Sequence, residues 1–147
     1  MSLFEVYDHD NIFAKIIRGE VPAVKLYETD SVLSFMDAFP QSPGHCLVIH
    51  KQSTATNLFD VPADALTEII TATQKIAAAV KNSLNPDGIR IMQFNGAPAG
   101  QTVFHLHFHI IPMYTDQSVG EHAAGGPADS EKLEELAIKI RENLKQN

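Results

Sequence analysis

The 147-residue chain is 44% hydrophobic and 20% charged, which is typical of one globular domain and excludes a largely disordered chain. Its formal net charge of −7 excludes a broad nucleic-acid surface, because such surfaces neutralise phosphates with clustered Lys and Arg. A small anionic substrate is still compatible with this charge if a local pocket supplies hydrogen-bond donors.

No targeting or membrane segment is predicted. The first ten residues lack the basic start and apolar core of a signal peptide, and no run approaches the ~20 apolar residues needed to cross a bilayer. The single cysteine, Cys46, cannot form an internal disulfide, and its apolar neighbours indicate a buried strand thiol. We therefore expect a cytoplasmic protein without membrane contact.

In chain order, the first predicted element is a short helix capped by Asp10. It carries Ile12, Phe13 and Ile16 on one face and ends at Gly19. Strands are predicted over 24–28, 32–37 and 45–49, and a loop containing two prolines and a glycine precedes the third strand.

A longer helix is predicted from near Asp60 and Pro62 to Leu84. Two more strands are expected over 89–95 and 102–111, and a last helix begins at Asp129 or Ser130 after a stretch rich in Gly and Ala. Because the strands cluster in hairpins and do not repeat βαβ units, the predicted fold class is α+β with an antiparallel sheet.

Histidine alternates with apolar residues over 105–111. Side chains alternate faces along a strand, so His105, His107 and His109 are predicted on one face, with a solvated run of surface histidines as the alternative. A protonated imidazole lowers the pKa of the next ring, so at least one ring should be neutral near pH 7, as a nitrogen nucleophile requires.

The loop before these histidines favours an anion. Its glycines, among them Gly100, allow backbone N–H groups to approach a phosphate, and Gln101 and Thr102 offer neutral donors. A metal site is the main alternative to a phosphate site, since two of the histidines together with His45 or Asp37 would form a zinc or iron ligand set. Donors suit phosphate oxygens and a cation needs acceptors, so the loop weighs against metal.

The run His105-Leu106-His107-Phe108-His109-Ile110-Ile111 resembles the His-φ-His-φ-His-φ-φ motif of the histidine triad (HIT) superfamily, in which φ is apolar. Asn95-Gly96 and 99–103 are similar to that family's approach to the triad. The segments 11–23, 35–37 and 43–49 resemble its opening helix and first strands.

The resemblance implies a single HIT domain over residues 1–147, with a core over about 11–112 and a C-terminal extension over 113–147 that carries no assigned motif. The implied HIT-like fold is an antiparallel sheet with one long helix and short flanking helices. By analogy with Hint-like members, the sheet would be continuous across a two-fold homodimer formed by the helix near 60–84 and the strand 89–95.

The resemblance also implies the catalytic roles. His107 would attack the α-phosphorus and form a nucleotidyl-histidine intermediate that water hydrolyses. His109 would bind developing charge and the leaving group, His105 would support the arrangement through hydrogen bonds, and His45 would line the same pocket.

The residues implied to bind a purine nucleotide are Ile12, Phe13, Ile16, Asp37, Asn95, Gly100, Gln101 and Thr102. Asp37 would accept hydrogen bonds from ribose hydroxyls. The polar residues of the loop would bind phosphate oxygens or order the loop, and the apolar residues would line the base pocket or pack in the core.

Some bacterial-type HIT members have a Cys-x-x-Cys pair and a histidine that together hold zinc. The matching positions here are Asn11, Ala14 and Ser53, so no cofactor is required and no structural zinc is expected. His50 stands where the family usually has proline, and we expect it to be an exposed strand-end residue.

The implied function is that of a Hint-like hydrolase or nucleotidyl transferase acting on the α-phosphate of nucleoside phosphoramidates or dinucleoside polyphosphates. His109 argues against the galactose-phosphate uridylyltransferase branch, which has glutamine at that position. The alternatives are a nucleotide-binding regulatory module with little turnover and a His-ligated metalloenzyme.

Overall fold

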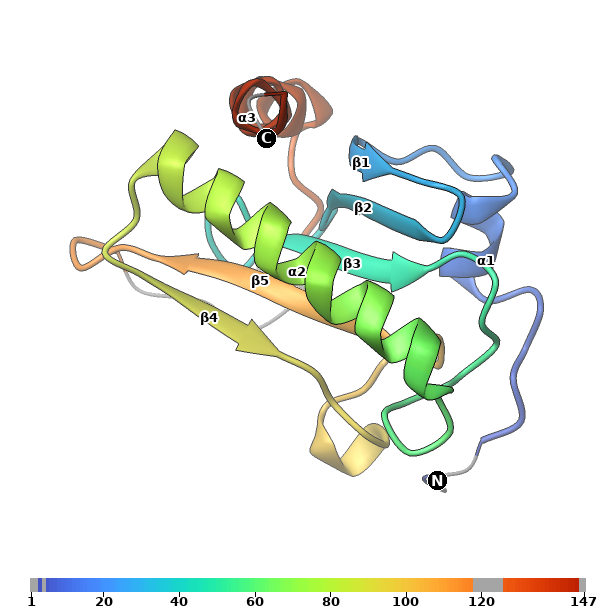
Figure 1. Cartoon of the computed structure of the whole chain (residues 1–147). Coiled ribbons are helices and arrows are strands. Elements are labelled where there is room, and N and C mark those ends of the chain that lie inside the picture. The colour runs from blue at the N-terminus through green and yellow to red at the C-terminus, as the bar shows by residue number, and fades with distance from the viewer. Residues whose placement is uncertain (1–2, 4, 118–125, 146–147) are drawn as a thin grey trace.

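The computed structural model describes residues 3, 5–117 and 126–145. In this part of the chain, five strands form one antiparallel sheet in the order β1-β2-β3-β5-β4 (Figure 1). The strands are β1 (Lys25–Glu28), β2 (Val32–Met36), β3 (Cys46–His50), β4 (Gly88–Met92) and β5 (His107–Met113). The helices are α1 (Ile12–Ile17), α2 (Ala63–Leu84), the 3₁₀ helix η1 (Ala97–Ala99) and α3 (Ser130–Leu144). The predicted α+β class is confirmed.

The long helix α2 lies across one face of the sheet, and α3 packs against α2 and β1 at the far edge (Figure 1). Among the described helices, none combines the length and apolarity that a bilayer span requires.

The start of α1 differs from the predicted one, whereas α2 begins directly after Pro62 as predicted, but without a cap from Asp60. The cap of α1 is Asn11 and not Asp10: its side-chain oxygen accepts a hydrogen bond from the Ala14 amide at 2.9 Å. The Asp60 carboxylate accepts from the amides of Thr56 and Asn57, so it ties the loop before α2 and does not cap that helix. Asp129 caps α3 as predicted.

The sheet has two apolar faces because side chains alternate along each strand. On the α2 face, strand residues such as Val48, Phe108 and Ile110 pack with apolar residues of α2. On the opposite face, residues such as Leu33 and Leu47 pack with those of α1. Each such large side chain, when fully buried, contributes roughly 1.5–3 kcal/mol to stability, so both helices are fixed on their faces.

His107 and His109 lie on the α1 face, where they pair in register with Ile49 and Leu47 of β3. The predicted strand over 102–111 is shorter at its start, because β5 begins at His107. The Leu106 amide donates to the Ala55 carbonyl at 3.0 Å, outside the sheet. His105 therefore precedes the strand, and the prediction that all three histidines share one strand face is wrong for His105.

Candidate active site

A cavity of about 700 Å³ opens on the α1 face of the sheet. It is lined by Ile12, Phe13, Ile16, Val21, Pro22, Ala23, Val24, Phe35, Met36, Asp37, Ala38, Phe39, Leu47, Thr102, Val103, His107, His109, Ala128, Ser130 and Leu133. Strands β2, β3 and β5 form its floor and α1 forms one wall. Seven of the predicted site residues line it, and most of the other lining side chains are apolar, so the cavity suits a flat apolar group held beside polar histidines.

His107 projects from the first position of β5 into this cavity. Its Nδ1 lies 2.7 Å from the backbone carbonyl oxygen of His105. A carbonyl can only accept, so Nδ1 carries the proton and the lone pair of the neutral ring is on Nε2. The rings of Phe13 and His107 form a T-shaped pair at a centroid distance of 4.9 Å, and this packing holds the His107 ring in place.

His109 is ordered by a chain of hydrogen bonds from the loop before β3. The Gln41 amide donates to Nδ1 of His45 at 3.0 Å, so the proton of neutral His45 is on Nε2. That Nε2 lies 3.0 Å from Nδ1 of His109, which accepts. The proton of neutral His109 is therefore on Nε2, and this side chain can deliver a proton to a bound group.

Asp37 completes this group at the end of β2. Its Oδ2 lies 3.3 Å from His45 Nε2, and its Oδ1 accepts from the Phe39 amide at 2.8 Å. Asp37, His45 and His109 are all buried. One potential ligand atom from each lies within 4.8 Å of the others, which is the clustering that a metal site would need. Because the proton of His45 is on the nitrogen that faces this cluster, a shared proton fits the site better than a cation does.

His105 is 1% exposed and lies just outside the strand. Its Nε2 donates to the His50 carbonyl at 3.0 Å, and its Nδ1 accepts from the Tyr7 hydroxyl at 2.7 Å. Burial is the main reason that the pKa of His105 falls to about 4; the hydrogen bond to the His50 carbonyl opposes this shift, and the neighbouring His107 adds to it. This ring is therefore neutral at physiological pH, as the sequence predicted for at least one histidine.

The loop before β5 is held together by its own polar groups. Gln101 is 3% exposed, and its amide accepts from the Gly96 N–H and donates to the Thr56 and Val103 carbonyls. Asn95 accepts from the Leu58 amide at 2.9 Å. Both side chains order the loop, which was one of the two predicted roles.

The amides of the glycine-containing turn are also used within it. The amides of Ala99, Gly100 and Gln101 donate to carbonyls of Gly96 and Ala97. The expectation that these N–H groups face an anion is therefore wrong, because the turn satisfies them internally. Gly100 has a φ of +110°, so the glycine serves the turn. Thr102 does line the cavity.

A model of the HIT domain matches residues 18–116 of the chain. The chain belongs to the HIT family. A Candida albicans protein named adenosine 5'-monophosphoramidase HNT1 is 39% identical over 140 residues, which cover 90% of each chain. An Arabidopsis thaliana protein named adenylylsulfatase HINT3 is 36% identical over 121 residues, which cover 78% of this chain and 61% of the relative. The crystal structure of a Hit-like protein from Bartonella henselae superposes with a TM-score of 0.86 at 50% identity, covering 95% of this chain and 100% of that one.

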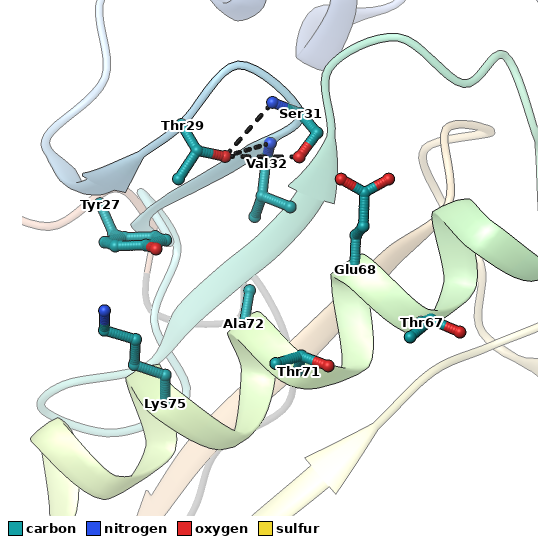
Figure 2. Close-up of a pocket in the computed structure, with 9 residues that line it drawn as sticks. All are labelled: Tyr27, Thr29, Ser31, Val32, Thr67, Glu68, Thr71, Ala72 and Lys75. Atoms are coloured by element: carbon teal, nitrogen blue, oxygen red, sulfur yellow. Dashed lines mark hydrogen bonds between the residues drawn. The ribbon is translucent and has the colours of Figure 1, made fainter.

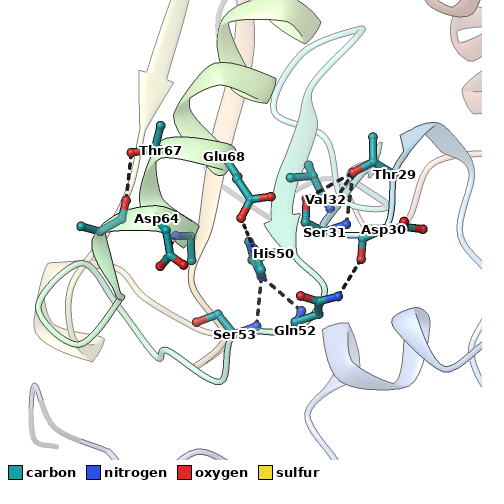
Figure 3. A network of polar contacts seen from close by, with 12 residues as sticks. Thr29, Asp30, Ser31, Val32, His50, Gln52, Ser53, Asp64, Thr67 and Glu68 are labelled. Atoms are coloured by element: carbon teal, nitrogen blue, oxygen red, sulfur yellow. Dashed lines mark hydrogen bonds and ion pairs between the residues drawn. The ribbon is translucent and has the colours of Figure 1, made fainter.

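The prediction that His50 is an exposed strand-end residue is wrong, because its side chain is buried. Its Nε2 contacts the Glu68 carboxylate of α2 at 3.2 Å, and its Nδ1 accepts from the amides of Gln52 and Ser53 (Figure 3). The side chain of His50 points toward α2, whereas its carbonyl meets His105 of the triad. Covering by α2 explains the burial.

A second hollow of about 400 Å³ lies between α2 and the β1–β2 hairpin (Figure 2). Tyr27 and Lys75 meet across it, with Lys75 Nζ 4.8 Å from the Tyr27 ring centroid. Glu68 and Ser31 lie at its other end, and the Glu68 carboxylate contacts His50. The hollow contains no histidine of the triad, because it lies on the α2 side of the sheet.

Sequence reasoning missed two parts of the site. Tyr7 reaches His105 across 98 residues of sequence, and no local pattern marks such a contact. Ala128, Ser130 and Leu133 bring the start of α3 to the cavity wall. The sequence predicted this helix but not the surface that it packs against.

Proposed function

We propose that this HIT chain hydrolyses nucleoside phosphoramidates through a nucleotidyl intermediate on His107. The observation that carries the proposal is the hydrogen bond from His107 Nδ1 to the His105 carbonyl, because it leaves the nucleophilic lone pair on Nε2 at a cavity of nucleotide size. The 39% identical relative named as an adenosine 5'-monophosphoramidase supports the same substrate class.

In the first chemical step, His107 Nε2 attacks the α-phosphorus and the bond from phosphorus to the leaving nitrogen breaks. As the proton on His109 Nε2 moves to that nitrogen, the proton on His45 Nε2 passes to His109 Nδ1, so His109 stays neutral and the amine leaves neutral; the second step returns the proton to His45. In the second step, water attacks the phosphorus, the bond to His107 Nε2 breaks, and His109 accepts the proton of the water. His45 sustains both steps because it holds His109 in the tautomer that donates from Nε2.

The apolar end of the cavity is suited to a purine base. Ile12, Phe13 and Ile16 of α1 all line it, and Phe13 and Ile16 are less than 10% exposed, at 7% and 6%. Asp37 also lines the cavity, and we assign its carboxylate to accept from ribose hydroxyls. We assign phosphate contact to Thr102 and to the histidines, and not to Gln101, whose amide is occupied in the loop.

The proposed reaction requires no metal or other cofactor. Within the described residues, Asn11 caps α1, Ala14 is buried in that helix, and the Ser53 hydroxyl accepts from the Ala55 amide. Their chemistry does not fit the zinc set of the bacterial-type members, which needs two thiolates and an imidazole.

We also propose that the protein is a homodimer through the edge strand β4. In the described part of the chain, β4 pairs on one side only, with β5, and its Ile91 is 45% exposed. Ile70 on α2 is 47% exposed. Light scattering should give twice the chain mass, and Ile91→Glu should give a monomer, while Ile138→Glu on α3 should not. A monomeric wild type contradicts the proposal.

The test of function is AMP release from an adenosine phosphoramidate and from diadenosine tetraphosphate, with and without a chelator. Wild type should turn over, and His107→Asn should lose at least about a thousandfold in kcat, because no other nitrogen can replace the nucleophile. A rapid acid-free quench followed by mass spectrometry should find wild type carrying one nucleotidyl group. The better substrate identifies the preferred leaving group.

Three outcomes separate the alternatives. Equal turnover by wild type and His107→Asn rejects the nucleophile assignment. Tight nucleotide binding without turnover in wild type indicates a regulatory binding module. Turnover that the chelator abolishes indicates a metalloenzyme built on Asp37, His45 and His109.

A further inference from the structure

The N-terminal segment lies against the catalytic end of the sheet. Leu3 lies beside the 3₁₀ helix η1, since a Cβ added at Gly96 would come 3.1 Å from the Leu3 side chain. The Leu3 carbonyl accepts a hydrogen bond from the Asn57 side chain at 2.6 Å, and the His9 carbonyl accepts from Arg18 at 2.6 Å. The segment is thus anchored on both sides of Tyr7.

Tyr7 contacts the first histidine of the triad. Its hydroxyl lies 2.7 Å from His105 Nδ1, and the two rings are tilted with centroids 5.6 Å apart. The other nitrogen of His105 donates to the His50 carbonyl, so Nδ1 of the neutral ring must accept, and the Tyr7 hydroxyl donates. Both nitrogens of His105 are therefore saturated by fixed partners.

The second partner of His105 is itself rigid. The ring of His50 is held by Glu68 and by the amides of Gln52 and Ser53 (Figure 3). The His50 carbonyl therefore has little freedom to move. His105 is clamped between this carbonyl and the Tyr7 hydroxyl. Of these two contacts, the one from Tyr7 comes from a segment outside the sheet and its connecting loops.

The clamp reaches the nucleophile through the backbone. The His105 carbonyl accepts from His107 Nδ1 at 2.7 Å, and this bond sets which nitrogen of His107 carries the lone pair. Phe13 contacts both rings, at centroid distances of 6.2 Å to His105 and 4.9 Å to His107. A shift of the His105 ring would therefore disturb the His107 ring both through the carbonyl and through Phe13.

We propose that Tyr7 is a positioning residue of the active site, which holds His105 and thereby fixes the tautomer and orientation of His107. The proposal rests on the proposed function of His107 as the nucleophile. It assigns the N-terminal segment a part in catalysis that does not require contact with the substrate.

The test is Tyr7→Phe, which keeps the ring and removes the hydroxyl. Its matched control is Tyr114→Phe, since the Tyr114 hydroxyl donates to the Pro43 carbonyl at 2.8 Å in an exposed setting outside the cavity lining. We expect kcat of Tyr7→Phe to fall about three- to tenfold, because one neutral hydrogen bond is lost. KM should change less than about twofold, because Tyr7 makes no contact with the substrate. Tyr114→Phe should keep the wild-type kcat.

A spectroscopic measurement tests the positioning without turnover. In ¹⁵N-labelled protein, the imidazole nitrogens report protonation and tautomer directly. Wild-type His105 should stay mostly neutral at pH 5, and in Tyr7→Phe it should be partly protonated there, since the donor that favours the neutral ring is gone. The His107 nitrogen signals should move toward a mixture of tautomers.

Unchanged His105 and His107 signals in Tyr7→Phe overturn the proposal, as does an equal loss of kcat in Tyr114→Phe. If wild type shows no turnover, the proposed function fails by itself. The imidazole signals then still decide whether Tyr7 holds His105 and His107.

Discussion

His45 Nε2 lies 3.0 Å from His109 Nδ1, although His45 directly precedes β3, His109 is in β5, and the two residues are 64 positions apart. The Gln41 amide donates to the other nitrogen of His45, so the direction of the contact is fixed: His45 donates and His109 accepts. Asp37 Oδ2, 3.3 Å from the same His45 nitrogen, keeps the proton there. His45 therefore determines which nitrogen of His109 carries the proton that His109 can donate.

His45→Asn should impair substrates that need a proton on the leaving group. We expect kcat for an adenosine phosphoramidate to fall about tenfold or more, because general acid catalysis contributes roughly 10²–10⁴ and His45 acts on it through His109. A nucleotide ester of p-nitrophenol, whose leaving group needs no proton, should lose no more than about twofold. An equal loss on both substrates would show that His45 only maintains the structure.

The burial of His105 should make stability depend on pH. Its pKa is about 4 in the folded protein, below the ordinary 6.5, so the unfolded chain binds the proton more readily between these values. Stability is therefore complete above about pH 6.5 and is lost as pH falls toward 4, by about 2 kcal/mol at pH 5 from this group. Denaturant unfolding at pH 7 and pH 5 measures the difference. In His105→Asn the difference should shrink by that amount, and the same pH dependence in both proteins would refute the assignment.

Gln101→Ala should destabilise the fold by about 2–4 kcal/mol, because it leaves the Gly96 amide and the Thr56 carbonyl without partners in a buried loop. The matched control is Gln52→Ala, whose side chain makes an exposed bond to the Asp30 carbonyl and should cost less than about 0.5 kcal/mol. Thermal and denaturant unfolding provide the measurement. A raised KM with unchanged stability would instead assign Gln101 to phosphate binding.

Gly44→Ala should cost more stability than Gly19→Ala. Both glycines have positive φ, +96° and +78°, so alanine costs roughly 1–2 kcal/mol of backbone strain at either position. An added Cβ at Gly44 would also overlap Leu84 and lie 3.1 Å from Pro112, whereas at Gly19 it meets nothing within 4 Å. We expect an additional loss of about 1–3 kcal/mol for Gly44→Ala, from overpacking. Equal denaturation midpoints for the two variants would contradict this.

The local sequence pattern was sufficient to predict the structure of a segment wherever that structure depended on a single periodicity. Alternation over 107–110 predicted His107 and His109 on one face and Phe108 and Ile110 on the other, and the register with β3 confirms it. The apolar run around Cys46 predicted a buried strand, and Cys46 is fully buried in β3. Both succeeded because strand geometry and burial of apolar side chains act on neighbouring residues.

Hydrogen-bond partners far along the chain were decided only by the tertiary structure. The Ala55 carbonyl binds the Leu106 amide and takes His105 out of the strand, and α2 covers His50. Tyr7 meets His105 across 98 residues, a contact that no local pattern encodes. A sequence therefore determines which side chains are available and which face they take within a strand. Which donor meets which acceptor depends on folding, because buried polar groups must find partners among whatever segments the packing brings together.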